Sequence, residues 1–180
     1  MPLNLDDLSG YTVTALAADL DRWFADEERV DVGSDIRPVT DFLQLLPSAD
    51  AAALAAFDTL VRSGRLAQFM DVYDWSYGFD FAANDCAVHG AEHVWALAAD
   101  GSSNLYVVLP DGSIRIWFHE EETLEEGTGF DNLDVFLWTM VRYRATLDGS
   151  LELAEVEDDL RALGQPGVLH AELGLLASLT

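Results

Sequence analysis

Apolar residues follow a strand pattern in the middle of the chain and a helical spacing on either side of it. Three short apolar runs, at 93–98, 104–109 and 113–119, are separated by turns that each contain an Asp-Gly dipeptide. Glycine readily supplies the positive φ that a tight turn needs, so the pattern predicts three strands of an antiparallel meander. The first two runs are apolar on both faces, which is typical of central strands covered on each side.

The third run alternates between two faces. Ile114, Ile116 and Phe118 are expected to point one way and the residues that follow each of them the other way. The acidic segment after His119 is interpreted as a solvated loop. A helix is then predicted to begin at the N-cap Asn132, with Asp134 in its first turn, where the helix dipole favours negative charge. Its apolar stripe should pack onto the sheet.

Helical periodicity dominates the N-terminal part of the chain. Amphipathic helices are predicted over residues 12–25, 38–46 and 48–62. Ser48 is the predicted N-cap of the third helix, and Gly64 is predicted to end it.

The C-terminal part shows the same periodicity. One helix is predicted from about residue 151 to Leu163, with Gly164 as its stop, followed by a linker at 165–167 and a final helix over 168–179.

Residues 69–81 hold six aromatic side chains that are spaced mainly by two. This period predicts an edge strand whose odd-numbered residues share a buried face. A second interpretation is that some of these rings line a groove for a partner, since aromatic residues are enriched at interface hot spots.

Together these elements predict an α+β fold, with an antiparallel or mixed central sheet covered by N-terminal and C-terminal helices. We expect a single domain over residues 1–180, with a helical N-terminal part (about 1–66) and a helical C-terminal extension (about 150–180).

Charge is the second strong feature of the chain. The 180 residues include 33 acidic ones and only nine basic ones, giving a formal net charge of −24. Such a field repels phosphate backbones and anionic lipid heads, so we expect no nucleic-acid and no membrane role. It favours rapid association with a basic partner. An alternative is that the charge only keeps the protein in solution.

Cysteine usage and the apolar runs bear on the compartment. The single cysteine, Cys86, cannot form an internal disulfide, no apolar run is long enough to span a bilayer, and the N-terminus lacks the features of a signal peptide. We therefore expect a cytoplasmic protein.

One constellation invites a metal-site interpretation. Cys86, His89 and His93 have a spacing that overlaps that of zinc ligands, and Asp85 and Glu92 lie beside them. A structural zinc site needs four ligands, and a second Cys or His pair is missing nearby. We therefore expect no bound metal and no other cofactor, with a buried cysteine and surface histidines as the simpler interpretation. No nucleophile, Walker or dinucleotide motif is present.

The meander and the helix after it resemble a known family. The run 98–106, with its Asp-Gly-Ser-Ser-Asn turn, is similar to the strand-turn-strand of the SUKH superfamily of cell-wall assembly regulators and immunity proteins. The second turn, the strand that ends near His119, and the helix start at 132–137 also look like that family. Ser103 stands where the family's turn commonly has Gly.

The resemblance implies a non-enzymatic protein-binding module. Together with the acidity, it favours an immunity protein that neutralises a cognate toxin by occluding a basic surface. The expected contact residues are Asp74, Trp75, Asp80, Trp117, Glu120, Glu121, Glu122 and Glu125. A regulatory adaptor of the same family is the alternative, and a metal-dependent enzyme built around Cys86 is a third hypothesis.

Overall fold

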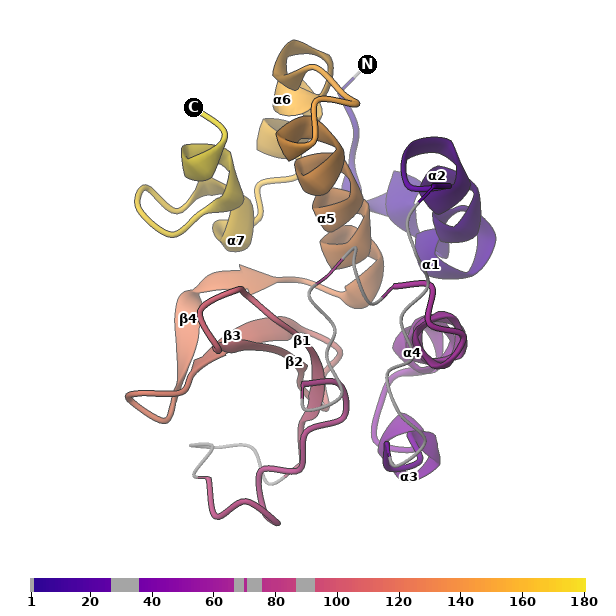
Figure 1. The fold of residues 1–180 in the computed structure, drawn as a ribbon, viewed down its shortest axis with the longest axis vertical. Coiled ribbons are helices and arrows are strands. Elements are labelled where there is room, and N and C mark those ends of the chain that lie inside the picture. The colour runs from indigo at the N-terminus through magenta and orange to yellow at the C-terminus, as the bar shows by residue number, and fades with distance from the viewer. Residues whose placement is uncertain (1, 27–35, 67–69, 71–75, 87–92) are drawn as a thin grey trace.

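The predicted meander is present, and it has one strand more than the apolar pattern indicates. A computed structural model describes residues 2–26, 36–66, 70, 76–86 and 93–180. Within them, one antiparallel sheet has the strand order β1-β2-β3-β4 (Figure 1). The strands are β1 (Trp95–Ala99), β2 (Leu105–Val108), β3 (Ile114–Phe118) and β4 (Thr123–Phe130). The three predicted strands are confirmed, but β1 lies at an edge of this sheet and not in its centre.

Aspartate side chains build the β1–β2 and β2–β3 turns, the second through Asp111, which accepts the backbone N–H of Ser113 at 2.9 Å. Asp100 accepts hydrogen bonds from the backbone N–H groups of Ser102 (2.7 Å) and Asn104 (3.2 Å). Gly101 and Gly112 have φ values of 88° and 87°, as the Asp-Gly pattern predicts. Ser103, at the position where a glycine is common in SUKH turns, also has a positive φ of 68°.

The fourth strand corrects the prediction that the acidic segment after His119 is a loop. Only its first part is a turn, because β4 begins at Thr123 and pairs with β3. The sequence hides this strand since its more exposed part carries glutamates and Gly127, and its buried end contains Gly129. A Cβ on Gly129 would lie 2.9 Å from the carbonyl oxygen of Ile114, so the close strand contact requires glycine.

Helix α5 (Leu133–Leu147) follows the meander, as predicted, and packs on the sheet. The side-chain oxygen of Asn132 accepts the backbone N–H of Val135 at 3.0 Å, which confirms the N-cap. On the sheet side, the ring centroid of Phe136 lies 4.9 Å from that of Tyr106 and 5.2 Å from that of Phe130. Other faces of α5 are buried as well, because the N-terminal helices pack on it (Figure 1).

The N-terminal helices are shorter than predicted. The helix expected over 12–25 is divided at Ala15 into α1 (Tyr11–Thr14) and α2 (Leu16–Trp23), and Val13, expected on the inner face, is 56% exposed. The turn η1 (Leu5–Leu8) precedes them, and α3 spans only Thr40–Leu43.

Helix α4 (Ser48–Arg62) has its predicted extent and ends before Gly64, whose φ is 77°. Its N-cap is Pro47, however, and no side chain caps it, so the prediction of a Ser48 cap is wrong. The C-terminal helix α6 (Leu153–Ala162) is confirmed. The predicted linker and final helix are replaced by α7 (Pro166–Leu169) and the short turn η2 (Leu175–Ser178).

Apolar side chains cover both faces of the sheet. Trp95, Ile114 and Ile116 belong to the cluster that faces α5, whereas Val107 and Trp117 belong to a second cluster on the opposite face. The alternation predicted for β3 is therefore confirmed. With this two-sided sheet and its covering helices, the α+β prediction is confirmed as well.

The predicted edge strand over 69–81 is wrong for its described part, since residues 76–81 form turns. The backbone N–H of Gly78 makes a 2.9 Å hydrogen bond to the carbonyl of Ala96 on β1. Tyr77 joins the cluster that faces α5, while Phe79 and Phe81 pack on the other face of the sheet. The odd-numbered aromatics therefore do not share a face, because the chain passes around the β1 edge here.

The two longest helices of the described residues, α4 and α5, have 15 residues each, and none of the helices described could cross a bilayer.

One arginine joins α5 to the N-terminal helices. The guanidinium of Arg142 pairs with Asp19 on α2 at 3.0 Å, and both side chains are more than four-fifths buried. The same guanidinium lies 4.1 Å from the Trp138 ring centroid and 5.3 Å from that of Trp23. Both side chains are largely buried, and the guanidinium also lies against two aromatic rings. Loss of one partner should therefore destabilise the fold more than loss of one partner of a surface ion pair.

We expect the substitution Arg142→Ala to lower the free energy of unfolding by about 2–4 kcal/mol, because it leaves the Asp19 carboxylate buried without its cation. The matched change Arg161→Ala removes an exposed pair with Glu157 and should cost about 0.3–0.5 kcal/mol. Urea unfolding of both variants measures the difference. Equal losses would contradict a structural role for the Arg142 cluster.

Candidate protein-binding surface

Most carboxylates of this chain cannot be neutralised by ion pairing, because 33 acidic residues face nine basic ones. The described residues form four ion pairs: Arg62–Asp58, Arg65–Asp21, Arg142–Asp19 and Arg161–Glu157. Other carboxylates accept hydrogen bonds from backbone N–H groups. The carboxylates that do neither are the ones available to a partner.

Three consecutive glutamates occupy the turn between β3 and β4. Glu120, Glu121 and Glu122 are exposed, and within the described part of the chain none of their carboxylates has a hydrogen bond or an ion pair. Glu122 has a φ of 51°, which places it in the left-handed region that non-glycine residues rarely adopt. We call this turn, Glu120–Glu122, the glutamate turn.

The base of the glutamate turn is held on both strands. At the end of β3, the Asn104 side-chain oxygen accepts the backbone N–H of His119 at 3.2 Å and lies 3.1 Å from its Nδ1. On β4, Glu125 is half-buried opposite Ile116, and its Oε1 accepts the backbone N–H of Gly127 at 2.9 Å. Glu125 follows the glutamate turn closely in the sequence, but its Oε1 is engaged in this hydrogen bond with the backbone of β4.

Trp117 does not have the exposure that a partner anchor needs. It is 5% exposed, and its ring centroid lies 4.9 Å from that of Phe81 and 6.5 Å from that of Phe79. Trp117 is buried because the segment with Phe79 and Phe81 covers this face of β3. The alternating pattern of β3 could not show whether that face is covered or exposed to solvent. The expected role of Trp117 as an anchor therefore does not fit its packing in the fold.

Asp80 lies beside His93 and Val94, just before β1. Its Oδ1 accepts the backbone N–H groups of Ala82 and Ala83, each at 3.1 Å. The structure therefore does not place Asp80 in one cluster with the glutamate turn. Two other expected contacts, Asp74 and Trp75, lie outside the described residues.

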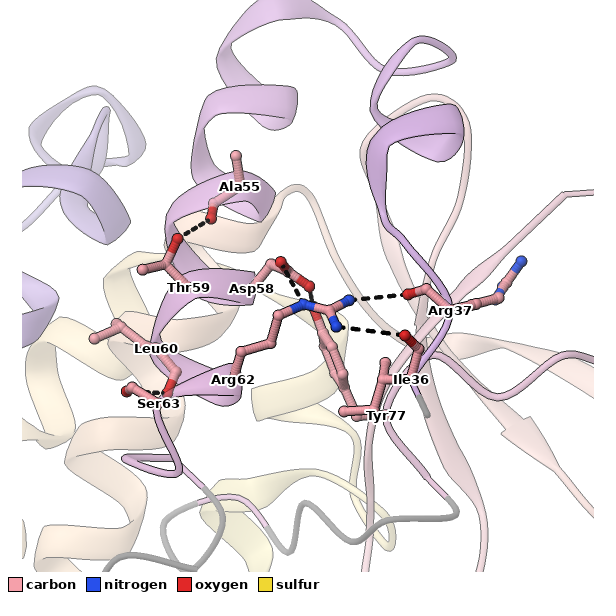
Figure 2. Close-up of polar contacts among 9 residues, drawn as sticks. All are labelled: Ile36, Arg37, Ala55, Asp58, Thr59, Leu60, Arg62, Ser63 and Tyr77. Atoms are coloured by element: carbon pink, nitrogen blue, oxygen red, sulfur yellow. Dashed lines mark hydrogen bonds and ion pairs between the residues drawn. The ribbon is translucent and has the colours of Figure 1, made fainter. Parts of the chain in front are cut away.

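A polar network fixes the segment that carries Asp80 (Figure 2). Asp58 on α4 accepts the hydroxyl of Tyr77 at 2.7 Å and the Nε of Arg62 at 2.8 Å. Arg62 also donates to the backbone carbonyl of Arg37 at 2.9 Å. Burial, followed by the nearby Asp58 carboxylate, raises the pKa of Tyr77 well above its usual range. Tyr77 therefore stays a neutral hydrogen-bond donor that ties the segment to α4.

The candidate metal ligands are only partly described. Cys86 is half-buried beside the second cluster, His93 is exposed just before β1, and Asp85 is exposed in a turn with a φ of 58°. His89 and Glu92 lie outside the described residues. Among the residues that are described, no three His, Cys, Asp or Glu side chains gather as metal ligands would.

Four aspartates that the sequence analysis did not group come together in a cleft of about 280 Å³. They lie at the N-terminal ends of η1, α4 and α5 and just before α5: Asp6, Asp50, Asp131 and Asp134. No local sequence motif indicates the cleft, because the residues that line it come from three segments that are far apart in the sequence.

Helix geometry accounts for much of this acidic cleft. First-turn carboxylates are favoured by the helix dipole. Asp134 also accepts the backbone N–H groups of Gly10 (2.7 Å) and Thr12 (2.8 Å), which lie at the start of α1. Asp131 accepts the side-chain N–H of Gln165 at 3.0 Å. These carboxylates therefore have structural roles, in contrast to those of the glutamate turn.

Comparisons with protein-family models, with curated proteins and with solved structures gave no match to this chain.

Asp50 is the member of the cleft whose negative charge is disfavoured by its surroundings. Burial raises its pKa, and the Asp134 and Asp111 carboxylates raise it further. Its carboxyl group also sits against the β2–β3 turn, since a Cβ on Gly112 would lie 2.5 Å from Asp50 Cγ. The native state therefore holds the Asp50 proton at pH values where the unfolded chain has already released it.

The stability that this proton confers is fully present below the unfolded-state pKa of Asp50 and is lost as the pH rises through the folded-state value. We expect Asp50→Asn to be more stable than the parent protein at neutral pH, with the difference shrinking towards acidic pH. Thermal unfolding across a pH series measures this. Asp158→Asn, at an exposed position of α6, is the control and should leave the pH profile unchanged. A destabilised Asp50→Asn at neutral pH would contradict the argument.

Proposed function

We propose that this chain is a protein-binding module that captures a basic partner protein through the glutamate turn. By its resemblance to the SUKH superfamily, we further propose that it is an immunity protein and that the partner is its cognate toxin. The proposed mechanism is occlusion: carboxylates cover a basic surface that the toxin uses for an anionic substrate.

The observation that carries the proposal is that, among the described residues, no hydrogen bond or ion pair engages the carboxylates of Glu120, Glu121 and Glu122. Three adjacent like charges repel one another, and none of the ion pairs in the described part of the chain offsets that repulsion. A cationic surface on a partner would offset it. Such charge complementarity mainly accelerates association and selects among partners.

Protection of a sheet edge is the competing explanation for acidic residues in this region. Charged residues on an edge strand discourage pairing with other chains. On β4 that role falls to Glu125 and Glu126, which lie within the strand. The glutamate turn precedes the strand, so edge protection does not explain it.

The test is binding to the product of the gene adjacent to this one, measured for a triple variant, Glu120→Gln/Glu121→Gln/Glu122→Gln. At low salt we expect the dissociation constant to rise about tenfold or more, mainly through slower association, because rim charges each contribute about 0.2–1 kcal/mol. The salt dependence of association should also decrease.

The matched control is Glu152→Gln/Glu155→Gln/Asp158→Asn, which removes the same charge from exposed positions around α6. It should retain most of the affinity. Equal weakening by both variants would indicate a general effect of net charge, and no weakening by the glutamate-turn variant would refute the assigned surface. Failure of the parent protein to bind, and to protect cells that express the neighbouring product, would refute the immunity role.

A further inference from the structure

A groove of about 320 Å³ lies beside Asp80, between α3 and the start of β1. The side chains of Phe42, Phe81 and Val94 line it and are each less than a tenth exposed. Leu45 adds an apolar edge that is 44% exposed to solvent. The three buried side chains thus form the apolar floor of the groove, and Leu45 forms its exposed apolar edge.

The one arginine among the described lining residues is committed to the fold. Arg37 donates from Nε to the carbonyl of Gly78 (2.9 Å) and from Nη2 to that of Val94 (3.1 Å). Its guanidinium lies 4.7 Å from the Trp95 ring centroid. Burial lowers the pKa of Arg37, and the charge of Asp80 acts in the opposite direction. The positive charge is therefore directed towards internal acceptors.

Two carboxylates of the groove keep free oxygen atoms. Asp41 on α3 is exposed and has neither a hydrogen bond nor an ion pair with any of the described residues. Asp80 uses Oδ1 for two backbone N–H groups, and no hydrogen bond involves its Oδ2. Two carboxylates against one guanidinium leave this groove with a negative balance, in a protein whose net charge is −24.

We propose that the groove receives one lysine or arginine side chain of the basic partner. Its aliphatic stem would pack on Phe42 and Phe81, and its charged head would reach the carboxylates of Asp41 and Asp80. Long basic side chains commonly bury the stem on apolar surface while keeping the head at a polar edge. The inference rests on the proposed function for the identity of the partner. It adds a second contact, apart from the glutamate turn.

The experiment uses a fragment, so that it does not depend on finding the partner. Amide chemical shifts of the full-length ¹⁵N-labelled protein are followed during titration with Nα-acetyl-arginine methylamide. The same titration uses the lysine analogue and the uncharged citrulline analogue. Work at moderate salt screens non-specific attraction.

We expect saturable shifts at Phe42, Leu45 and Phe81 with a basic fragment, and at least fivefold weaker binding of citrulline. Asp41→Asn/Asp80→Asn should weaken the basic fragment about three- to tenfold, since two partly exposed charges are lost. Asn at position 80 retains a side-chain acceptor for the backbone, and an unchanged amide spectrum elsewhere verifies the fold. The glutamate-turn variant should bind the fragment as the parent protein does.

Shifts that do not saturate, that centre on the glutamate turn, or that are equal for citrulline would overturn the inference. So would unchanged binding by the double variant. These outcomes are separable from failure of the proposed function: a partner that binds through the glutamate turn while the groove ignores basic fragments refutes only the groove. A groove that selects basic fragments in a chain without a basic partner refutes only the immunity role.

Discussion

The excess of carboxylates over cations is the constraint on which the rest of this structure depends. With 33 acidic and nine basic residues, ion pairing can neutralise only a minority of the negative charges. The fold instead gives many of them backbone N–H donors. Asp100 and Asp111 close the two meander turns, and Asp134 holds the start of α1. Backbone N–H groups carry no net charge. They therefore stabilise these carboxylates without neutralising the negative charge of the chain.

The few cations lie where elements have to be joined. Arg142 links α5 to α2, and Arg62 links α4 to the segment around Arg37 and, through Asp58, to Tyr77. These contacts join the helices to one another and to the segments beside the sheet, while apolar clusters cover the two sheet faces. The β3–β4 hairpin extends from that rigid base. Its turn can therefore present carboxylates in a fixed arrangement, which favours rapid and selective capture of a partner.

The acidic surfaces differ in whether their carboxylates have a role in the fold. The aspartates of the cleft beside α5 lie at helix starts or hold backbone groups, so the fold explains them without a ligand. Glu120–Glu122 have no such explanation, and neither does Asp41 at the groove. The proposed contacts thus lie in two places, the turn before β4 and the groove beside the start of β1.

Local chemistry allowed the sequence to predict three strands, both Asp-Gly turns and the Asn132 cap. Each depends on residues only a few positions apart, so period and turn preference suffice. The sequence did not indicate β4, because its glycines and glutamates form a strand only when β3 supplies the partner. Nor could it show that Tyr77 and Phe81 lie on opposite sides of the sheet, or that Trp117 is covered. The sequence alone determined the local elements and the negative charge. Tertiary packing decided the rest, because the groups that pair with Asp19 and Asp134 come from distant parts of the chain, whereas the donors to Asp100 and Asp111 are only a few residues away.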